Sequence, residues 1–206
     1  MARPLNPLIL TLVAIITILY AWKKVMPLKA TIKNLRQGRD GERYVGQMLE
    51  ELRERGYRIF HDIPGEGFNI DHVIVGPAGV FTIETKARSK PPTGRPTIEY
   101  DGNIIRLENG FGFDEPLKQA RAQARWLTNL LNDGRGRLFR ARPVVVFPDW
   151  YVERTGPRRK DDVWVLNPKA LGTFLDYERA ALSADRIDMA SNTLAQRCRG
   201  PHHEET

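Results

Sequence analysis

The chain has 206 residues, 41% of them hydrophobic and 28% charged, which fits one domain with its own core and excludes a wholly disordered chain. Lysine and arginine total 32 against 25 acidic residues, and the resulting net charge of +7 favours a polyanionic partner, either nucleic acid or an anionic lipid surface. The single cysteine, Cys198, excludes an intramolecular disulfide and a cysteine-rich zinc site.

An uncharged apolar run comes first in the chain. A helix over residues 5–22, at about 1.5 Å rise per residue, is just long enough to cross a bilayer. Tyr20 and Trp22 end the run, where aromatic rings favour the headgroup region, and Lys23 and Lys24 follow. The pattern predicts an N-terminal transmembrane helix that contacts the membrane through residues 5–22. The positive-inside rule then predicts a single-pass protein of the cell inner membrane, with its C-terminal domain in the cytoplasm.

Two alternatives stay open for this segment. A cleaved signal peptide needs small residues before the cleavage site, whereas Leu19 occupies the −3 position. A buried core helix carries polar residues at helical spacing, which the run lacks. The expected organisation is then a transmembrane anchor, a basic juxtamembrane linker, a globular domain, and a helical C-terminal extension packing on the same domain, over residues 1–25, 26–37, 38–150 and 151–206.

Helices and strands alternate through the remaining sequence. An apolar stripe formed by Val45, Met48, Leu49 and Leu52 predicts a helix over 41–55, with Gly56 as its C-cap. Runs of β-branched residues, helical spacing and turn residues predict the later elements: a strand at 57–63, hairpins at 69–86 and 97–107, a helix at 116–131, a strand at 143–147 and a helix at 183–197. This order predicts an α/β sandwich with a mixed central β-sheet flanked by helices.

Acidic residues lie at matching positions of the 69–86 hairpin. If the hairpin turns symmetrically about Pro77 and Ala78, paired residue numbers sum to 155 and Asp71 faces Glu84. Lys86 lies two residues beyond Glu84 and therefore on the same face of its strand. His72 points to the opposite face, where packing or surface hydrogen bonding is expected.

Two opposed carboxylates destabilise a sheet unless a cation lies between them. Mg²⁺, or Mn²⁺, held by Asp71 and Glu84 would provide one, and a neighbouring ammonium would complete a site for cutting a phosphodiester. From spacing alone, Asp71 as a turn residue at a strand end, with Glu84 and Lys86 as a solvated edge pair, is equally compatible with the sequence.

Three sequence blocks resemble the nuclease-related domain (NERD) family of the PD-(D/E)xK restriction-endonuclease-like superfamily. They are Gly38-x-x-Gly41-Glu42, the block from Asn69-Ile70-Asp71 to Glu84-Thr85-Lys86, and Pro116-Leu117-x-Gln119-Ala120. The resemblance implies a restriction-endonuclease-like sandwich for residues 38–150. It also implies that Asp71, Glu84 and Glu42 bind metal, that Lys86 is the catalytic lysine, and that Gln119 lies alongside. Glu115 departs from the family pattern, which has Asn before the Pro-Leu-x-Gln block.

These observations predict a membrane-anchored, Mg²⁺-dependent nuclease whose partner is nucleic acid, with DNA favoured over RNA. One alternative is a non-catalytic module that binds nucleic acid or protein at the membrane with the same fold. Another is a structural protein whose basic linker binds anionic lipid.

Overall fold

The computed structural model describes the backbone of residues 7–91, 93–108, 110–134, 136–157, 159 and 163–199. The chain divides into two compact units, residues 1–39 and residues 40–206. Helix α1 (Pro7–Glu50) begins in the first unit and ends in the second, and the 3-10 helix η1 (Glu51–Arg55) follows it. Gly56 has a φ of 80°, and its N–H donates to the carbonyl oxygen of Arg53. The predicted C-cap is confirmed.

No helix within the described ranges is long and apolar enough to cross a membrane. The predicted N-terminal transmembrane helix through residues 5–22 is therefore wrong, and so is the predicted single-pass inner-membrane localisation. Residues 5 and 6 of that span lie outside the described residues. Within the described residues the helix begins at Pro7, and its first charge comes at Lys23. The described uncharged part therefore measures about 24 Å, against a hydrocarbon core of about 30 Å.

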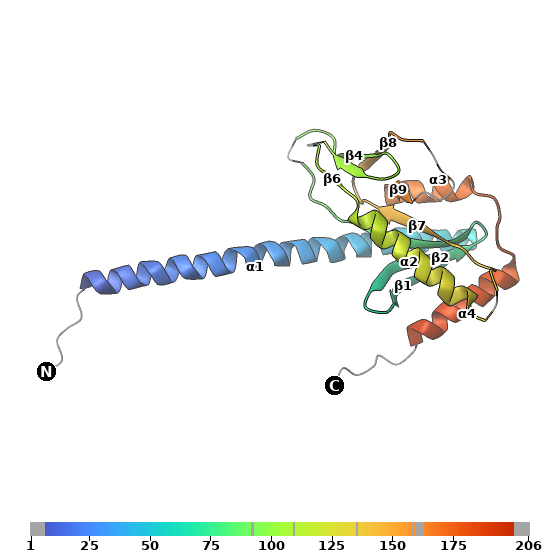
Figure 1. Ribbon diagram of the computed structural model, residues 1–206, viewed down its shortest axis with the longest axis horizontal. Helices are drawn as coiled ribbons and strands as arrows, with labels where there is room; N and C mark the ends of the chain where they lie inside the picture. The colour runs from blue at the N-terminus through green and yellow to red at the C-terminus, as the bar shows by residue number, and fades with distance from the viewer. Residues whose placement is uncertain are drawn as a thin grey trace. The chain divides into compact units, whose positions relative to one another are not determined.

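The central sheet has five strands in the order β1-β2-β3-β7-β9. They are β1 (Arg58–Pro64), β2 (Asn69–Gly76), β3 (Gly79–Thr85), β7 (Ala141–Val146) and β9 (Trp164–Leu166). Pairing is antiparallel from β1 to β3 and parallel from β3 through β7 to β9, so the predicted mixed sheet is confirmed. Parallel neighbours need a long crossover, and helix α2 (Glu115–Asn132) provides it between β3 and β7 (Figure 1).

A second sheet was not predicted. Its four strands lie in the order β6-β5-β4-β8, formed by β6 (Gly112–Phe113), β5 (Ile105–Leu107), β4 (Thr97–Tyr100) and β8 (Tyr151–Arg154). The expected hairpin at 97–107 is confirmed as β4 and β5. The expectation of one central sheet is corrected to two mixed sheets, because β6 and β8 are too short to show a periodic pattern in the sequence.

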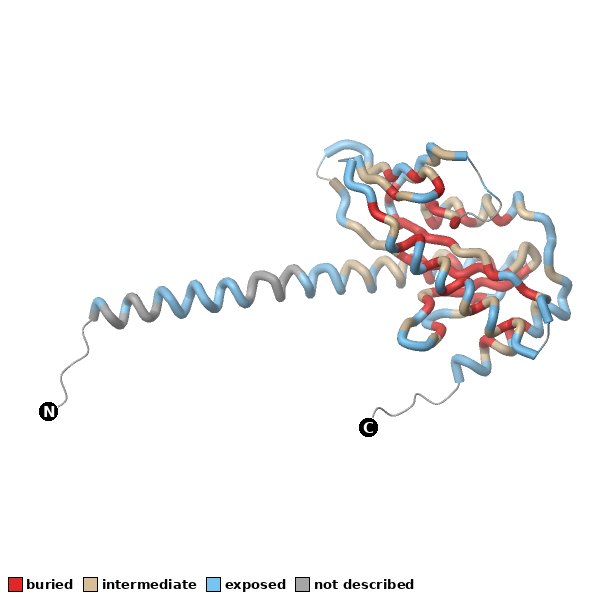
Figure 2. Tube along the Cα trace, in the orientation of Figure 1, coloured by how far each residue is buried: buried red, intermediate tan, exposed pale blue. Residues whose placement is uncertain are grey.

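Buried side chains form three clusters around the sheets. One face of the central sheet packs against the end of α1, η1 and α3 (Leu171–Asp176), which the 3-10 helix η2 (Pro168–Ala170) precedes. The other face packs against α2 and α4 (Ala184–Arg199). The third cluster joins the small sheet to the start of α2 and to β7. Figure 2 shows the buried residues following the strands and the inner faces of these helices. The fold is therefore a mixed α/β one with two mixed sheets and helices, which corrects the predicted sandwich with a single central sheet and a transmembrane helix.

Candidate active site

The hairpin of β2 and β3 brings Asp71 to Glu84. Its pairs run from Gly76↔Gly79 to His72↔Ile83, and the numbers in each pair sum to 155 as predicted. One residue further along the same register lie Asp71 and Glu84. The Asp71 carboxylate reaches across to β3, where its Oδ2 accepts a hydrogen bond of 2.7 Å from the backbone N–H of Thr85.

Beside Asp71, the alternation of side chains between the two faces of the sheet reverses in the strand pair β1–β2. Asp62 has a φ of +50°, an uncommon left-handed conformation for a residue other than glycine. Before Asp62, Ile59 packs in the core on the α1 side, whereas Ile63 and Ile70 pack in the core on the α2 side. Asp62 therefore lies opposite Asp71 where the strand alternation reverses. The sequence offered no register for Asp62, and the structure adds it to the surroundings of the site.

Glu84 and Lys86 form an ion pair on one face of β3. Lys86 Nζ donates to Glu84 Oε1 at 2.6 Å and to Gln119 Oε1 of α2 at 3.0 Å. Glu84 is only 2% exposed, and a carboxylate so buried requires charged or hydrogen-bonding partners. The structure thus brings together four residues that the sequence singled out: Asp71, Glu84, Lys86 and Gln119.

Gln123 belongs to this cluster and was missed in the sequence. Its Nε2 donates to Glu84 Oε2 at 2.6 Å and to the backbone oxygen of Asn69 at 3.2 Å. Its Oε1 is buried and has no hydrogen-bond partner among the described residues. Gln123 follows Gln119 by four residues and so lies one turn further along the same face of α2. That i,i+4 pair was the signal that could have identified it.

Glu42 reaches the cluster from the last part of α1. Gly41, beside it, packs so closely on Ala87 that an added Cβ would lie 2.6 Å from the Ala87 Cβ. Burial raises the pKa of Glu42, and the negative charges of Asp62 and Glu84 raise it further. Glu42 therefore lies close enough to Asp62 and Glu84 for their charges to affect its pKa, which agrees with its predicted approach to the site.

Burial, followed by repulsion between carboxylates, dominates the electrostatics of the site. Burial raises the pKa of Asp71 to about 7, and the charge of Glu84 adds to the shift. The N–H of Thr85 and the ammonium of Lys86 act in the opposite direction but do not cancel it. The cluster therefore carries more negative charge than its single lysine neutralises, which is the condition under which a divalent cation binds.

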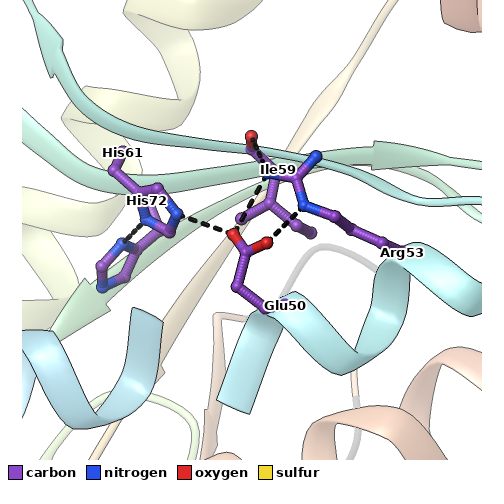
Figure 3. Close-up of polar contacts among 5 residues, drawn as sticks. All are labelled: Glu50, Arg53, Ile59, His61 and His72. Carbon is purple, nitrogen blue, oxygen red and sulfur yellow. Dashed lines mark hydrogen bonds and ion pairs between the residues drawn. The ribbon is translucent and has the colours of Figure 1, made fainter. Parts of the chain in front are cut away.

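His61 and His72 lie against each other on the α1 side of the sheet (Figure 3). Strand alternation had predicted that His72 points away from the face of Asp71. Their Nδ1 atoms are 2.8 Å apart, and His61 Nε2 lies 3.0 Å from Glu50 Oε1. Arg53 pairs with Glu50 and donates to the backbone oxygen of Ile59 at 3.1 Å. This cluster links α1 and η1 to β1 and β2.

Comparison with known proteins gives one family match. A family model described as nuclease-related domain (NERD) matches residues 37–148. An uncharacterized protein of Bacillus anthracis is 31% identical over 70 residues, which is 30% of this chain and 33% of that protein. The solved structure of Pyrococcus furiosus SfsA in complex with Ca²⁺ has a TM-score of 0.27 and 17% identity, covering 74% of this chain and 54% of that chain. This chain therefore spans about a third of the curated relative and about half of the solved one.

Proposed function

Because this chain belongs to the nuclease-related domain family, we propose that it is a metal-dependent nuclease that hydrolyses phosphodiester bonds. The family match covers more than half of the chain and contains the whole candidate site, and it confirms the resemblance drawn from the sequence blocks. The observation that carries the proposal is the cluster of Asp71, Glu84 and Lys86, in which two carboxylates and an ammonium meet at the end of one hairpin.

The donor set of the cluster fits Mg²⁺ or Mn²⁺. Asp71 and Glu84 would hold the ion, with Glu42 as a third carboxylate, and all three offer the oxygen ligands that these ions prefer. Among the described residues, no three histidine, cysteine or acidic side chains are already arranged around one metal position. Mg²⁺ does not require such a cage, since it keeps several waters and takes one or two carboxylates plus substrate phosphate. When bound, the ion polarises the phosphoryl oxygen and acidifies its water.

Lys86 is the proposed catalytic lysine. Its ammonium is held between Glu84 and Gln119, so its position is fixed before substrate arrives. As an ammonium it orients the attacking water and offsets the negative charge that develops on the phosphoryl group, whereas deprotonating that water would require the neutral amine. Gln119 positions Lys86, while Gln123 positions Glu84 from the other side.

Nucleic acid is the proposed substrate, with DNA favoured over RNA. The chain carries a net charge of +7 and a sequence pI of about 9.7, which favours association with a polyanion. Charge alone does not distinguish the two nucleic acids, so both belong in the assay.

A non-catalytic binding module is the second candidate, and one observation favours it. Both carboxylate oxygens of Glu84 are engaged, Oε1 by Lys86 and Oε2 by Gln123. A metal would have to share Glu84 with these partners. Titration with Mg²⁺ and Mn²⁺ separates the two candidates, because a pure binding module takes up neither ion at Asp71 and Glu84.

The deciding experiment compares the full chain with its Lys86→Ala variant. Circular and linear DNA and RNA are incubated with Mg²⁺, with Mn²⁺ or with EDTA. We expect cleavage only with metal, and a loss of at least about 100-fold in the variant, because general acid–base groups contribute about 10²–10⁴ to rate. Circular dichroism confirms that the variant is folded, and Lys169→Ala, an exposed lysine on η2, is the matched control. Undiminished cleavage by Lys86→Ala would refute the assignment.

A further inference from the structure

A cavity of about 720 Å³ lies at the end of the central sheet where the parallel strands β3 and β7 begin. Its floor is formed by the first residues of these strands, at 79–81 and 141–143. Glu84 of the candidate active site lies five residues further along β3 than Gly79, which is about 17 Å at about 3.3 Å per residue. The cavity is therefore separate from the candidate active site, and it has the size of a small-molecule binding site.

Hydrogen bonds hold both walls of the cavity in place. One wall is the segment 177–182 between α3 and α4, where the N–H groups of Ala181 and Leu182 donate to the carbonyl oxygen of Pro77 at 2.7 and 3.2 Å. The other wall is the chain that leads into β7, where the N–H of Leu138 donates to Asn132 Oδ1 at 2.8 Å. Because backbone groups fix both segments, the cavity is formed before a ligand arrives, as is usual for small-molecule sites.

Three arginines and one carboxylate line the cavity, so positive charge is in excess. They are Arg140, Arg142, Arg179 and Glu178. The guanidinium of Arg142 lies 4.7 Å from the ring centroid of Trp164, and its Nη2 donates to Glu178 Oε2 at 3.4 Å, which uses one of its five N–H donors. Arg179 is exposed and makes no hydrogen bond or ion pair within the part of the chain that the structure describes. Arginine can bind a phosphate through two parallel N–H bonds, so this lining suits a phosphate group.

The rest of the lining is apolar or aromatic. Val80, Phe81 and Ala141 are buried beneath the cavity, and Leu182 is half-buried beside it. Tyr177 also lines the cavity and is 86% exposed, and its ring makes no stacking contact with any of the described residues. An open aromatic ring and an apolar floor beside arginines suit a ligand that joins a flat base to a phosphate.

We propose that this cavity binds a nucleoside phosphate, with the phosphate on Arg142 and Arg179 and the base against Tyr177. The proposal goes beyond the nuclease activity and does not rest on it, because none of these residues belongs to the cluster of Asp71 and Glu84. Inorganic phosphate has no flat body for the ring and the apolar floor. A nucleic-acid strand needs a continuous groove, whereas a cavity of this volume takes a single nucleotide.

Isothermal titration calorimetry of the full chain in EDTA tests the cavity without any contribution from a bound metal. The probes are adenosine monophosphate (AMP), adenosine and inorganic phosphate, and we expect AMP to bind more tightly than either of its parts. Arg179→Ala should weaken AMP binding by about 10- to 100-fold, the effect of losing a hydrogen bond to a charged group. Arg199→Ala, at an exposed arginine at the far end of α4, is the matched control and should leave AMP binding unchanged.

Tyr177→Ala separates the two halves of the ligand. It should weaken AMP binding by about 5- to 100-fold, the range that loss of one base–aromatic stack produces, and leave the affinity for inorganic phosphate unchanged. Arg179 and Tyr177 are both exposed, so their substitution should leave the fold intact.

Three results would overturn the proposal: no binding of AMP, an AMP affinity unchanged in Arg179→Ala or in Tyr177→Ala, or inorganic phosphate binding as tightly as AMP. A single-stranded oligonucleotide is titrated in parallel. If it binds more tightly than AMP and loses affinity in Arg179→Ala, the cavity belongs to nucleic acid and the proposal is also overturned. Because these titrations contain EDTA and measure no cleavage, their outcome is independent of whether the chain is a nuclease.

Discussion

Replacing Gln123 with leucine separates stability from catalysis at the candidate site. The buried Gln123 side chain donates from Nε2 to Glu84 Oε2 at 2.6 Å and to the backbone oxygen of Asn69 at 3.2 Å. Within the part of the chain that the structure describes, its Oε1 has no hydrogen-bond partner. Leucine has a similar size and no polar atoms, so Gln123→Leu removes the donor and the unpaired acceptor together.

The two contributions to stability oppose each other. Loss of a hydrogen bond to a charged group costs about 1.5–3 kcal/mol, while removal of a buried, unpaired polar atom recovers about 1–3 kcal/mol. The free energy of unfolding should therefore change by no more than about 2 kcal/mol, which moves the thermal midpoint of a chain of this size by about 8 °C at most. For the rate of cleavage, no second contribution offsets the loss of the Gln123 hydrogen bond. Glu84 loses the partner that fixes Oε2, and a small misplacement in an active site can lower the rate by about 100-fold.

Thermal unfolding and Mg²⁺-dependent cleavage are measured on the same Gln123→Leu preparation. Gln47→Leu, the same substitution at an exposed position of α1, is the control and should alter neither. The reasoning fails if Gln123→Leu cleaves at the wild-type rate, because Glu84 would then not need its second partner. A large loss of stability would also contradict it, since the opposing contributions would not have cancelled.

Two further predictions concern pH. The pKa of Asp71 is raised to about 7, so the folded metal-free chain holds a proton that the unfolded chain releases, and stability falls as pH rises from about 4 to 7. Asp71→Asn should therefore raise the urea midpoint at pH 8 while abolishing Mg²⁺ binding; a lowered midpoint would contradict this. Burial lowers the pKa of His72 to about 4, so neutral His72 contributes up to about 3 kcal/mol to the free energy of unfolding above pH 6.5. This contribution is lost as pH falls through 4. Urea unfolding of His72→Phe between pH 4 and 7 should show a flatter profile than the wild type, and an equal slope would refute the role of His72.

The hairpin was predictable because its information is local. Two runs of β-branched residues flank Gly76-Pro77-Ala78-Gly79, and a turn of fixed length sets the register of both strands. From that register the neighbourhood of Asp71 and Glu84 followed by counting. Gln119 and Glu42 lie on other elements, and only the resemblance to a known family brought them to the hairpin.

Other features depend on contacts that a linear pattern does not contain. The hydrogen bond from Gln123 to Glu84 forms only because α2 packs over β3 in the folded chain. No sequence pattern marks the reversal of side-chain alternation at Asp62, because a left-handed backbone conformation is expected at glycine. The transmembrane prediction was wrong, because residues 5–22 met the length requirement in the sequence but no helix among the described residues is long and apolar enough to cross a membrane. Helix boundaries are the least certain part of any assignment from sequence.

The left-handed backbone at Asp62 shows a compromise between the stability of the fold and the charge at the candidate site. Glycine would adopt a φ of +50° without penalty, whereas a residue with a side chain spends about 1–2 kcal/mol there. The chain nevertheless carries a carboxylate at this position, and its charge repels that of Glu42. A sequence selected for stability alone would have glycine here. Asp62 therefore marks a place where the fold has given up stability to keep negative charge beside Glu42.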